Sequence, residues 1–363
     1  MKYLFYFGHP AHYHLFKNII RELIKRNHNI KVVIKTKDIL EELCVDSGIE
    51  YQNVLPEGRK DNKLSIAISF AKKYYRISKI LAKIFKPDLL IGSEPTLPHL
   101  GKIFNIPSII FSEDDAKIIP QFARIAYPFV STILSPYSCD AGKWEYRKIG
   151  YNGFHKLAYL HPSVFKPDRS KINNLAKENY IILRFAELTA YHDNNRNGID
   201  REIARELINI LKTFGKVYIT SEKKLGPELE RYRLKIDPLN IHHALYFAKM
   251  YIGDSQSMAV EAALLGTPGI RFNDFADEIG VLFELEHLYG LTTSVKSSDP
   301  DKLIDTVNKL LITSNLQEKY QERRTKMLNE KIDVLKFFVW FIDNYPESAK
   351  TMKKNPDYQW KFK

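Results

Sequence analysis

Short apolar runs alternate with longer segments of helical periodicity through the first half of the chain. The apolar runs, which are typical of buried strands, lie at residues 3–7, 30–34, 88–91 and 108–111. Helical periodicity fills residues 14–26 and 38–46. Strands that alternate with helices form parallel sheets, because each helix returns the chain to the same edge. The first half therefore predicts a doubly wound, Rossmann-like α/β domain.

The same alternation restarts after a turn-rich segment at residues 150–167. Further strands are predicted at 180–185, 217–220 and 250–252, and a helix at 199–213. Three helical segments end the chain, and the last of them, at 332–344, carries an aromatic run that must be buried. We expect domains at 1–165 and 166–330. Residues 331–363 would form a helix that braces the first domain, followed by a loosely held polar tail.

Residues 253–272 combine a strand end, a polar loop, a helix and a second strand. Ser255, Gln256 and Ser257 come where the helix must begin. The exposed backbone N–H groups and partial positive charge of a helix start suit a diphosphate. Glu261 lies one turn further on and can face the same ligand, where a carboxylate would accept from ribose hydroxyls. The alternative interpretation is that the serines only cap the helix and Glu261 is a solvated surface residue.

Polar residues also follow several other predicted strands. They are Gly8, His9 and His12 after the first strand, Glu94 and Glu113 after two later ones, and Arg184 and Arg271 at strand ends of the second half. Ligands of open α/β sheets bind beyond the carboxyl ends of the strands, so these residues are site candidates.

Two of these candidates are carboxylates that could act as a base and an acid. Proximity and burial can separate the pKa values of Glu94 and Glu113. The alternative at each strand end is a helix cap, formed by Ser93 or Glu94 at the first and by Asp114 or Asp115 at the second. Arg271 could neutralise a diphosphate or form a salt bridge. No carboxylate and histidine set completes a metal site around His9 and His12, so we expect substrate binding there and no metal or other cofactor.

Charge is distributed unevenly along the chain. Lys and Arg number 55 against 43 Asp and Glu, a net +12. Residues 1–165 contribute 24 against 15, or +9. Residues Lys60 to Lys86 hold eight Lys and Arg with the single acidic Asp61, interleaved with apolar residues as in a basic amphipathic helix. This segment is either the solvated face of a packing helix or a contact for an anionic membrane. No nucleic-acid motif accompanies it, and we expect no nucleic-acid partner.

Composition favours a cytoplasmic protein. Only Cys44 and Cys139 are present, which excludes a disulfide framework. No apolar stretch approaches the roughly 18 residues of a membrane-spanning helix, and the apolar run at 3–7 is too short for a secretory signal. Contact through residues 60–86 would place the protein at the inner face of the cell membrane.

Three motifs carry a resemblance to a known family. The segments GHPAHYHLFKNII, GYNGFHKLAYLHP and GDSQSMAVEAALLGTPGIRF closely resemble a family of predicted glycosyltransferases catalogued as a domain of unknown function, DUF354. The resemblance spans residues 1 to about 345 and implies the GT-B fold. In that fold two Rossmann-like domains face each other across a cleft, and the carboxyl-terminal domain holds a nucleotide sugar.

That family is in turn similar to the non-hydrolysing UDP-N-acetylglucosamine 2-epimerases. Their corresponding loop has a serine at the diphosphate and a glutamate at the ribose, which this resemblance assigns to Ser255 and Glu261, with an arginine at Arg271. Paired glycines of the epimerase loop are replaced by Gln256 and Ser257. The histidine-arginine motif of the epimerases is not reproduced around Arg184.

The leading hypothesis is transfer of a sugar from a nucleotide-diphosphate donor, UDP-linked by resemblance, to a glycan or lipid-linked acceptor. Glu113 or His12 would deprotonate the acceptor hydroxyl. The alternatives are a 2-epimerase, in which Glu94 and Glu113 move a proton, and a non-catalytic binder of nucleotide sugars or polyanions.

Overall fold

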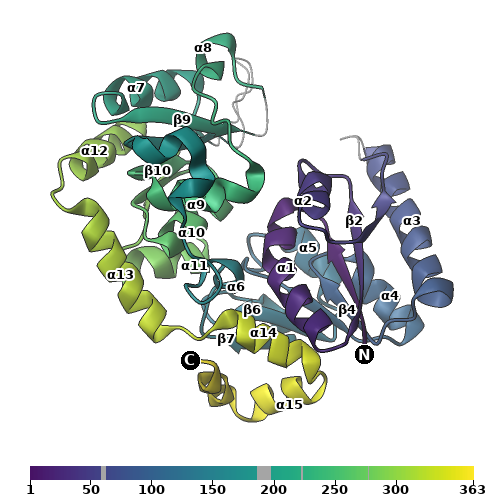
Figure 1. Ribbon diagram of the computed structural model, residues 1–363. Helices are drawn as coiled ribbons and strands as arrows, with labels where there is room; N and C mark the ends of the chain where they lie inside the picture. Colours follow the sequence, from purple (N-terminus) through teal and green to yellow (C-terminus); the bar gives the residue numbers. More distant parts are fainter. Residues whose placement is uncertain (59–62, 186–197, 222–223, 277) are drawn as a thin grey trace. The chain divides into compact units, whose positions relative to one another are not determined.

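The chain folds into two compact units, each built around one parallel sheet (Figure 1). The computed structural model describes residues 1–58, 63–185, 198–221, 224–276 and 278–363. Unit 1 contains Met1–Tyr159 together with Lys331–Lys363, and unit 2 contains Leu160–Glu330. The end of the chain therefore belongs to the first unit. Among the described residues, no helix combines the length and apolarity needed to span a bilayer.

Unit 1 contains a seven-stranded sheet with the order β3-β2-β1-β4-β5-β6-β7. All pairs are parallel, and the strands are β1 (Lys2–Phe7), β2 (Asn29–Lys35), β3 (Tyr51–Leu55), β4 (Leu89–Gly92), β5 (Ser108–Phe111), β6 (Thr132–Pro136) and β7 (Lys148–Tyr151). The order reverses between β1 and β4, and ligands of such sheets bind at this reversal. The four strands predicted in this half are confirmed, while β3, β6 and β7 were not predicted.

Helices cover both faces of this sheet (Figure 1). They are α1 (Pro10–Lys25), α2 (Leu40–Asp46), α3 (Lys63–Lys79), which a π-helical turn Ile80–Ile84 continues, α4 (Thr96–Phe104), α5 (Pro120–Ala126), α6 (Leu157–Leu160), α14 (Val334–Asp343) and α15 (Glu347–Lys354). The start of the basic segment, Lys60 to Asn62, lies outside the described residues. Helix α1 begins earlier than predicted because Pro10 suits a first helical position and His9 caps it. His9 and His12 are thereby placed at the start of the helix.

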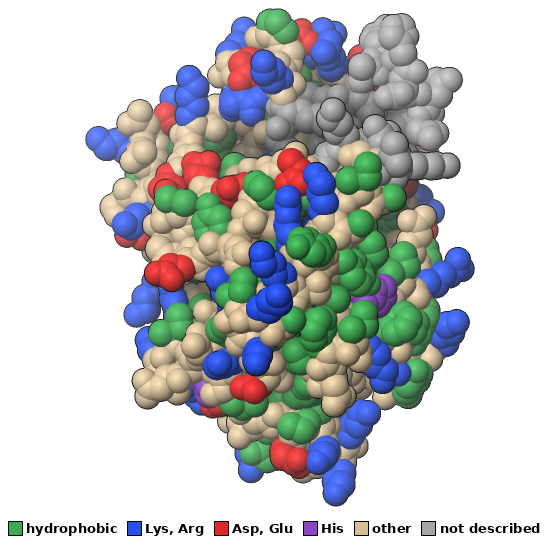
Figure 2. Space-filling model, turned by 90° about the vertical axis from the view of Figure 1, so that its right-hand side faces the viewer, with side chains coloured by type: hydrophobic (Ala, Val, Ile, Leu, Met, Phe, Trp, Pro, Cys, Tyr) green, Lys and Arg blue, Asp and Glu red, His purple; other side chains and the backbone are tan. Residues whose placement is uncertain are grey.

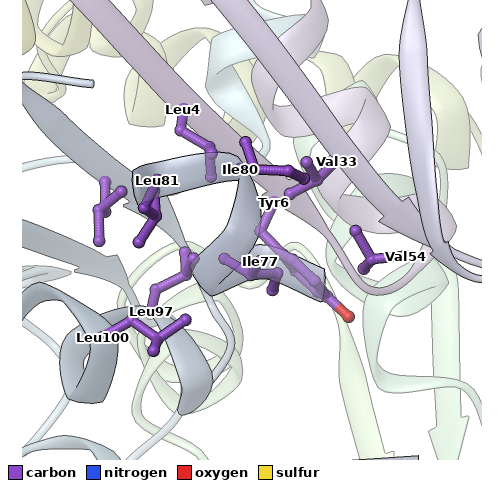
Figure 3. Close-up of a cluster of buried hydrophobic side chains, with 10 residues drawn as sticks. Leu4, Tyr6, Val33, Val54, Ile77, Ile80, Leu81, Leu97 and Leu100 are labelled. Atoms are coloured by element: carbon purple, nitrogen blue, oxygen red, sulfur yellow. The ribbon is translucent and has the colours of Figure 1, made fainter. Parts of the chain in front are cut away.

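The face under α3 and α4 is closed by a continuous apolar cluster (Figure 3). It joins Leu4, Tyr6, Val33, Val54 and Leu90 of the strands to Ile77, Ile80, Leu81, Leu97 and Leu100 of the helices. These side chains are almost fully buried, so the inner stripe of the basic segment is a packing surface. Lys72, Lys79 and Lys83 of this segment are exposed, whereas Lys73 is buried.

The opposite face is completed by helix α14 from the end of the chain. The ring of Phe338 lies 5.0 Å from those of both Phe111 and Tyr151, and α14 packs beside α1. Burial of the aromatic run at 332–344 is as predicted. The expectation of a loosely held tail is wrong, because α15 follows and Gln359 is buried, accepting from the Asn152 N–H at 2.6 Å.

Unit 2 contains a five-stranded parallel sheet with the order β12-β11-β10-β8-β9. The strands are β8 (Tyr180–Phe185), β9 (Lys216–Ser221), β10 (Met250–Gly253), β11 (Gly269–Phe272) and β12 (Thr293–Val295). Its helices are α7 (Arg201–Leu211), α8 (Pro227–Glu230), α9 (Ile241–Phe247), α10 (Gln256–Leu265), α11 (Gly280–Phe283), α12 (Pro300–Leu311) and α13 (Leu316–Glu330). The strand order reverses between β8 and β10, so α10 begins at the reversal.

We predict that Phe338→Ala destabilises the protein by about 3–5 kcal/mol, because it removes a buried ring and leaves a cavity against Phe111 and Tyr151. Urea unfolding followed by circular dichroism measures the change. Ile24→Ala, at a half-exposed position on α1, is the matched control and should change stability by less than about 0.5 kcal/mol. Equal effects of the two substitutions would show that α14 does not brace unit 1.

Candidate functional site

In unit 2, strand β10 passes into helix α10 through a turn that only glycine permits. A side chain at Gly253 would place its Cβ 2.6 Å from the Arg184 carbonyl oxygen and 2.7 Å from the Tyr251 hydroxyl. The same hydroxyl donates to the Ser255 carbonyl at 3.2 Å. Close packing at Gly253 and the hydrogen bond to Ser255 therefore hold the backbone before and after the turn, which fixes where α10 begins.

Ser255 is the N-cap of α10, and its hydroxyl accepts the Met258 N–H at 3.4 Å. Gln256 and Ser257 occupy the first two helical positions, whose N–H groups have no acceptor in a preceding turn. These groups and the helix dipole provide partial positive charge at the carboxyl edge of the sheet. The sequence predicts a phosphate or diphosphate at these N–H groups, and this stays a prediction.

Glu261 is held in place by a histidine that sequence analysis did not connect with it. The carboxylate lies 3.2 Å from His242 Nε2, and both side chains are largely buried. His242 belongs to α9, which packs against α10. The interpretation of Glu261 as a solvated surface residue is therefore wrong. Its fixed orientation one turn from the helix start is consistent with a binding role.

The two arginines flank Gly253 on neighbouring strands, and their surroundings differ. Arg184 of β8 and Arg271 of β11 both pair in register with Gly253. Arg184 is partly exposed, whereas Arg271 is 1% exposed and donates to the Phe275 carbonyl at 3.1 Å and to Ser294 Oγ at 3.0 Å. Arg184 can therefore reach a ligand, and Arg271 shapes the strand end from within the core.

In unit 1, the first strand delivers Gly8 and two histidines to the start of α1. A Cβ at Gly8 would lie 3.1 Å from the Tyr6 ring and 3.6 Å from Lys35 Cε. Lys35 at the end of β2 is thus a neighbour that the sequence pattern did not single out. His9 Nδ1 accepts the Ala11 N–H at 3.2 Å.

His12 is a neutral hydrogen-bond donor in this structure. Its Nδ1 accepts the Gly8 N–H at 3.1 Å, which leaves the ring proton of the neutral imidazole on Nε2. Burial, and then the charges of His9, Lys35 and His155, lower the pKa of His12 to about 3. A ring with this tautomer can donate to an anionic oxygen but has no lone pair on Nε2 to accept a proton.

Glu113 is engaged in a buried ion pair at the end of β5. It accepts from Lys156 Nζ at 2.5 Å and from the His155 backbone N–H at 2.6 Å. Although burial by itself would raise the pKa of Glu113, Lys156 and His155 lower it below its ordinary value. Such a carboxylate stays ionised and is a weak proton acceptor. His155 and Lys156 lie in the motif GYNGFHKLAYLHP, which was the available sequence signal for them.

The pKa of Asp114 is shifted in the opposite direction to that of Glu113. Burial raises the pKa of its carboxyl, and the neighbouring Glu113 and Asp115 charges raise it further, while Lys156 lowers it in part. The side chain is partly exposed, unlike Asp115, which accepts the Asp140 N–H at 2.6 Å. A carboxylate with raised pKa is the better proton acceptor of the group. Sequence analysis regarded Asp114 only as a helix cap.

Glu94 lies on the other face of the same sheet, beside α3. It pairs with Lys73 Nζ at 2.6 Å and accepts from Thr96 Oγ1 at 3.1 Å. Burial, and then the charge of Glu94, raise the pKa of Tyr6 well above its ordinary value. Glu94 and Glu113 thus each form an ion pair with a different lysine.

Within the described residues, no cluster of three or more His, Cys, Asp or Glu side chains could hold a metal ion.

A family model described as "Protein of unknown function (DUF354)" matches residues 6–339. Among solved structures, the kitacinnamycin glycosyltransferase is 14% identical to this chain with a TM-score of 0.56, and the match covers 94% of this chain and 98% of the glycosyltransferase. The UDP-GlcNAc 2-epimerase of Neisseria meningitidis, bound to UDP-GlcNAc, is 16% identical with a TM-score of 0.62, and the match covers 91% of this chain and 95% of the epimerase. The MnaA–UDP co-structure from S. aureus is 12% identical with a TM-score of 0.64, covering 96% and 97%.

These neighbours establish the GT-B fold for this chain, as the motifs predict. No curated protein matches the sequence. The fold is shared by glycosyltransferases and epimerases, so the fold by itself does not assign an activity to this chain.

We predict that His12 stays neutral with its proton on Nε2 between about pH 5 and pH 8, because burial and neighbouring positive charge exclude a second proton. Long-range ¹H–¹⁵N correlation spectra of the imidazole groups report both the tautomer and the titration. In urea-denatured protein the same ring should titrate near about 6.5. A folded-state midpoint near that value would refute the assignment and return His12 to the list of candidate bases.

Proposed function

Because this chain belongs to the DUF354 family and has the GT-B fold, we propose that it transfers a sugar from a nucleotide-diphosphate donor to an acceptor hydroxyl. The observation that carries the proposal is the amino end of α10, where Ser255, Gln256 and Ser257 precede a buried and oriented Glu261. Unit 2 would bind the donor, and unit 1 would handle the acceptor.

Donor binding follows from the chemistry of the unit 2 residues. The N–H groups of Gln256 and Ser257, together with Arg184, would stabilise the diphosphate, both in the bound donor and in the leaving group. Glu261, oriented by His242, would accept hydrogen bonds from the ribose hydroxyls. A uridine nucleotide is the donor class we favour, since two of the similar structures were solved with UDP or UDP-GlcNAc.

Transfer would proceed by attack of the acceptor oxygen on the anomeric carbon. The bond from that carbon to the diphosphate oxygen breaks, and the electron pair leaves with the nucleoside diphosphate. We propose Asp114 as the group that takes the acceptor proton, with Glu113 holding Lys156 in place. The uncharged His12 would donate a hydrogen bond from Nε2 to an anionic oxygen. This revises the initial roles of Glu113 and His12, whose pairing and tautomer make each a poor base.

The acceptor we favour is a hydroxyl of a growing surface polysaccharide or of a lipid-linked glycan. The excess of positive charge in residues 1–165 would attract an acceptor that carries phosphate.

We predict that Glu261→Gln weakens UDP binding about tenfold, because a neutral amide loses charge-assisted hydrogen bonds to ribose. Isothermal titration calorimetry of the whole protein measures the affinity. Glu318→Gln, at an exposed position on α13, is the matched control and should bind UDP like the unmodified protein. Unchanged affinity of Glu261→Gln would remove Glu261 from the donor site, and no UDP affinity in any variant would refute nucleotide-sugar binding altogether.

We predict that Asp114→Asn lowers the rate of sugar transfer by about 10²–10⁴-fold while leaving UDP affinity unchanged, because an amide cannot accept the acceptor proton. Release of UDP from UDP-sugars in the presence of glycan or lipid-linked acceptors measures the rate. Asp46→Asn, at an exposed position on α2, controls for the loss of a charge. An Asp114→Asn variant with undiminished turnover would exclude Asp114 as the base.

The 2-epimerase remains the second candidate, because the epimerases share the fold over nine tenths of this chain. In that reaction Glu94 and Glu113 would remove and return a proton, but each is ion-paired with a lysine here. Incubation with UDP-sugars in the absence of any acceptor separates the two. Formation of an epimer would refute the transferase proposal.

A further inference from the structure

One face of unit 1 is covered by helices without any acidic residue. Helix α3 with its π-helical turn, α4 and α5 contain no Asp or Glu. The three helices are neighbours, because the His99 ring of α4 lies 5.9 Å from that of Tyr74 on α3 and 4.6 Å from that of Phe129, just after α5. His99 Nε2 also lies 2.7 Å from the Ile125 carbonyl. The helices therefore form one surface.

The structure separates the basic residues of this surface into two groups. Lys72 and Arg76 pair with Glu57, and Lys73 pairs with the buried Glu94, so three positive charges are neutralised within the unit. Five further basic residues are exposed near the carboxyl ends of the helices. This exposed group, with no ion pair in the described part of the chain, comprises Lys79, Lys83, Lys86, Lys102 and Arg124.

Large apolar side chains are exposed at the same helix ends. Ile84 is 56% exposed, Ile103 69%, Ile125 46% and Phe129 44%. Phe85 and Phe104, next to two of them, pack on the same apolar cluster, which places the ends of α3 and α4 side by side. Figure 2 faces this side of the molecule and shows green apolar side chains between blue Lys and Arg side chains. We call this surface the basic apolar face.

We propose that the basic apolar face docks on an anionic lipid bilayer. Lysine and arginine side chains would contact anionic headgroups, each contributing attraction that falls off within a Debye length. Ile84, Ile103 and Phe129 would enter the boundary between headgroups and acyl chains. Exposed isoleucine offers nothing to a nucleic-acid phosphate backbone, so the apolar component distinguishes a bilayer from other polyanions.

Docking in this way would leave the candidate site of unit 1 exposed. Helices of a parallel α/β sheet run opposite to the strands, so the carboxyl ends of α3, α4 and α5 lie at the edge away from Gly8, Glu113 and Asp114. The surface is thus separate from those residues, and the proposal does not depend on the reaction proposed above.

Cosedimentation of the full-length protein with vesicles tests the proposal. Binding to vesicles of phosphatidylcholine and phosphatidylglycerol should exceed binding to phosphatidylcholine alone by at least about tenfold, and should weaken as salt is raised. The double charge reversal Lys79→Glu, Lys83→Glu should reduce the affinity for anionic vesicles at least about tenfold. Ile103→Ser should reduce it by about threefold.

Matched controls are available at the carboxyl end of α12 in unit 2, in its last turn and at the residue that follows it. Lys309→Glu reverses an exposed lysine in the last turn of a helix, and Ile312→Ser replaces an isoleucine that is 79% exposed. Neither should change vesicle binding, and circular dichroism verifies that all variants are folded. The proposal is overturned if anionic vesicles bind no better than neutral ones, or if the controls match the face variants. It is also overturned if a short DNA duplex binds as tightly as the vesicles and Ile103→Ser has no effect on either.

Discussion

The parallel arrangement of both sheets is the constraint on which the rest of the structure depends. All carboxyl ends of parallel strands lie at one edge, so residues far apart in the sequence are gathered there without any further device. This is how Gly8, Glu113 and Asp114 reach one edge of unit 1, and Arg184 and Ser255 one edge of unit 2. The helices that follow these strands then begin at the same edge and contribute their N–H groups.

The sequence allowed the strand ends to be predicted, but not the partners found there. Apolar runs before Glu94 and Glu113 identified the positions, because buried strands leave a strong local pattern. Lys73 and Lys156, which form ion pairs with those carboxylates, come from other segments of the chain. Nothing in a linear pattern encodes which lysine reaches which carboxylate. The tautomer of His12 likewise depends on a backbone N–H, which every residue offers equally.

Three carboxylates each contact a basic side chain, and this shared feature favours binding or positioning roles for them over proton acceptance. Glu94 is paired with Lys73, Glu113 with Lys156 and Glu261 with His242. A carboxylate that is ionised and fixed binds or positions well, while a proton acceptor benefits from a raised pKa. The surroundings of Asp114 meet the second requirement because burial outweighs the neighbouring lysine. Residue type alone would have ranked all four carboxylates equally.

The return of the chain end to unit 1 affects the order in which the protein can fold during synthesis. Phe338 covers Phe111 and Tyr151, yet it leaves the ribosome after the whole of unit 2. Residues 1–159 therefore emerge before the helix that covers Phe111 and Tyr151, whereas unit 2 is made of one continuous segment. Until Phe338 has emerged, Phe111 and Tyr151 lack the ring that covers them, and exposed apolar surface of this kind favours aggregation of the incomplete first unit.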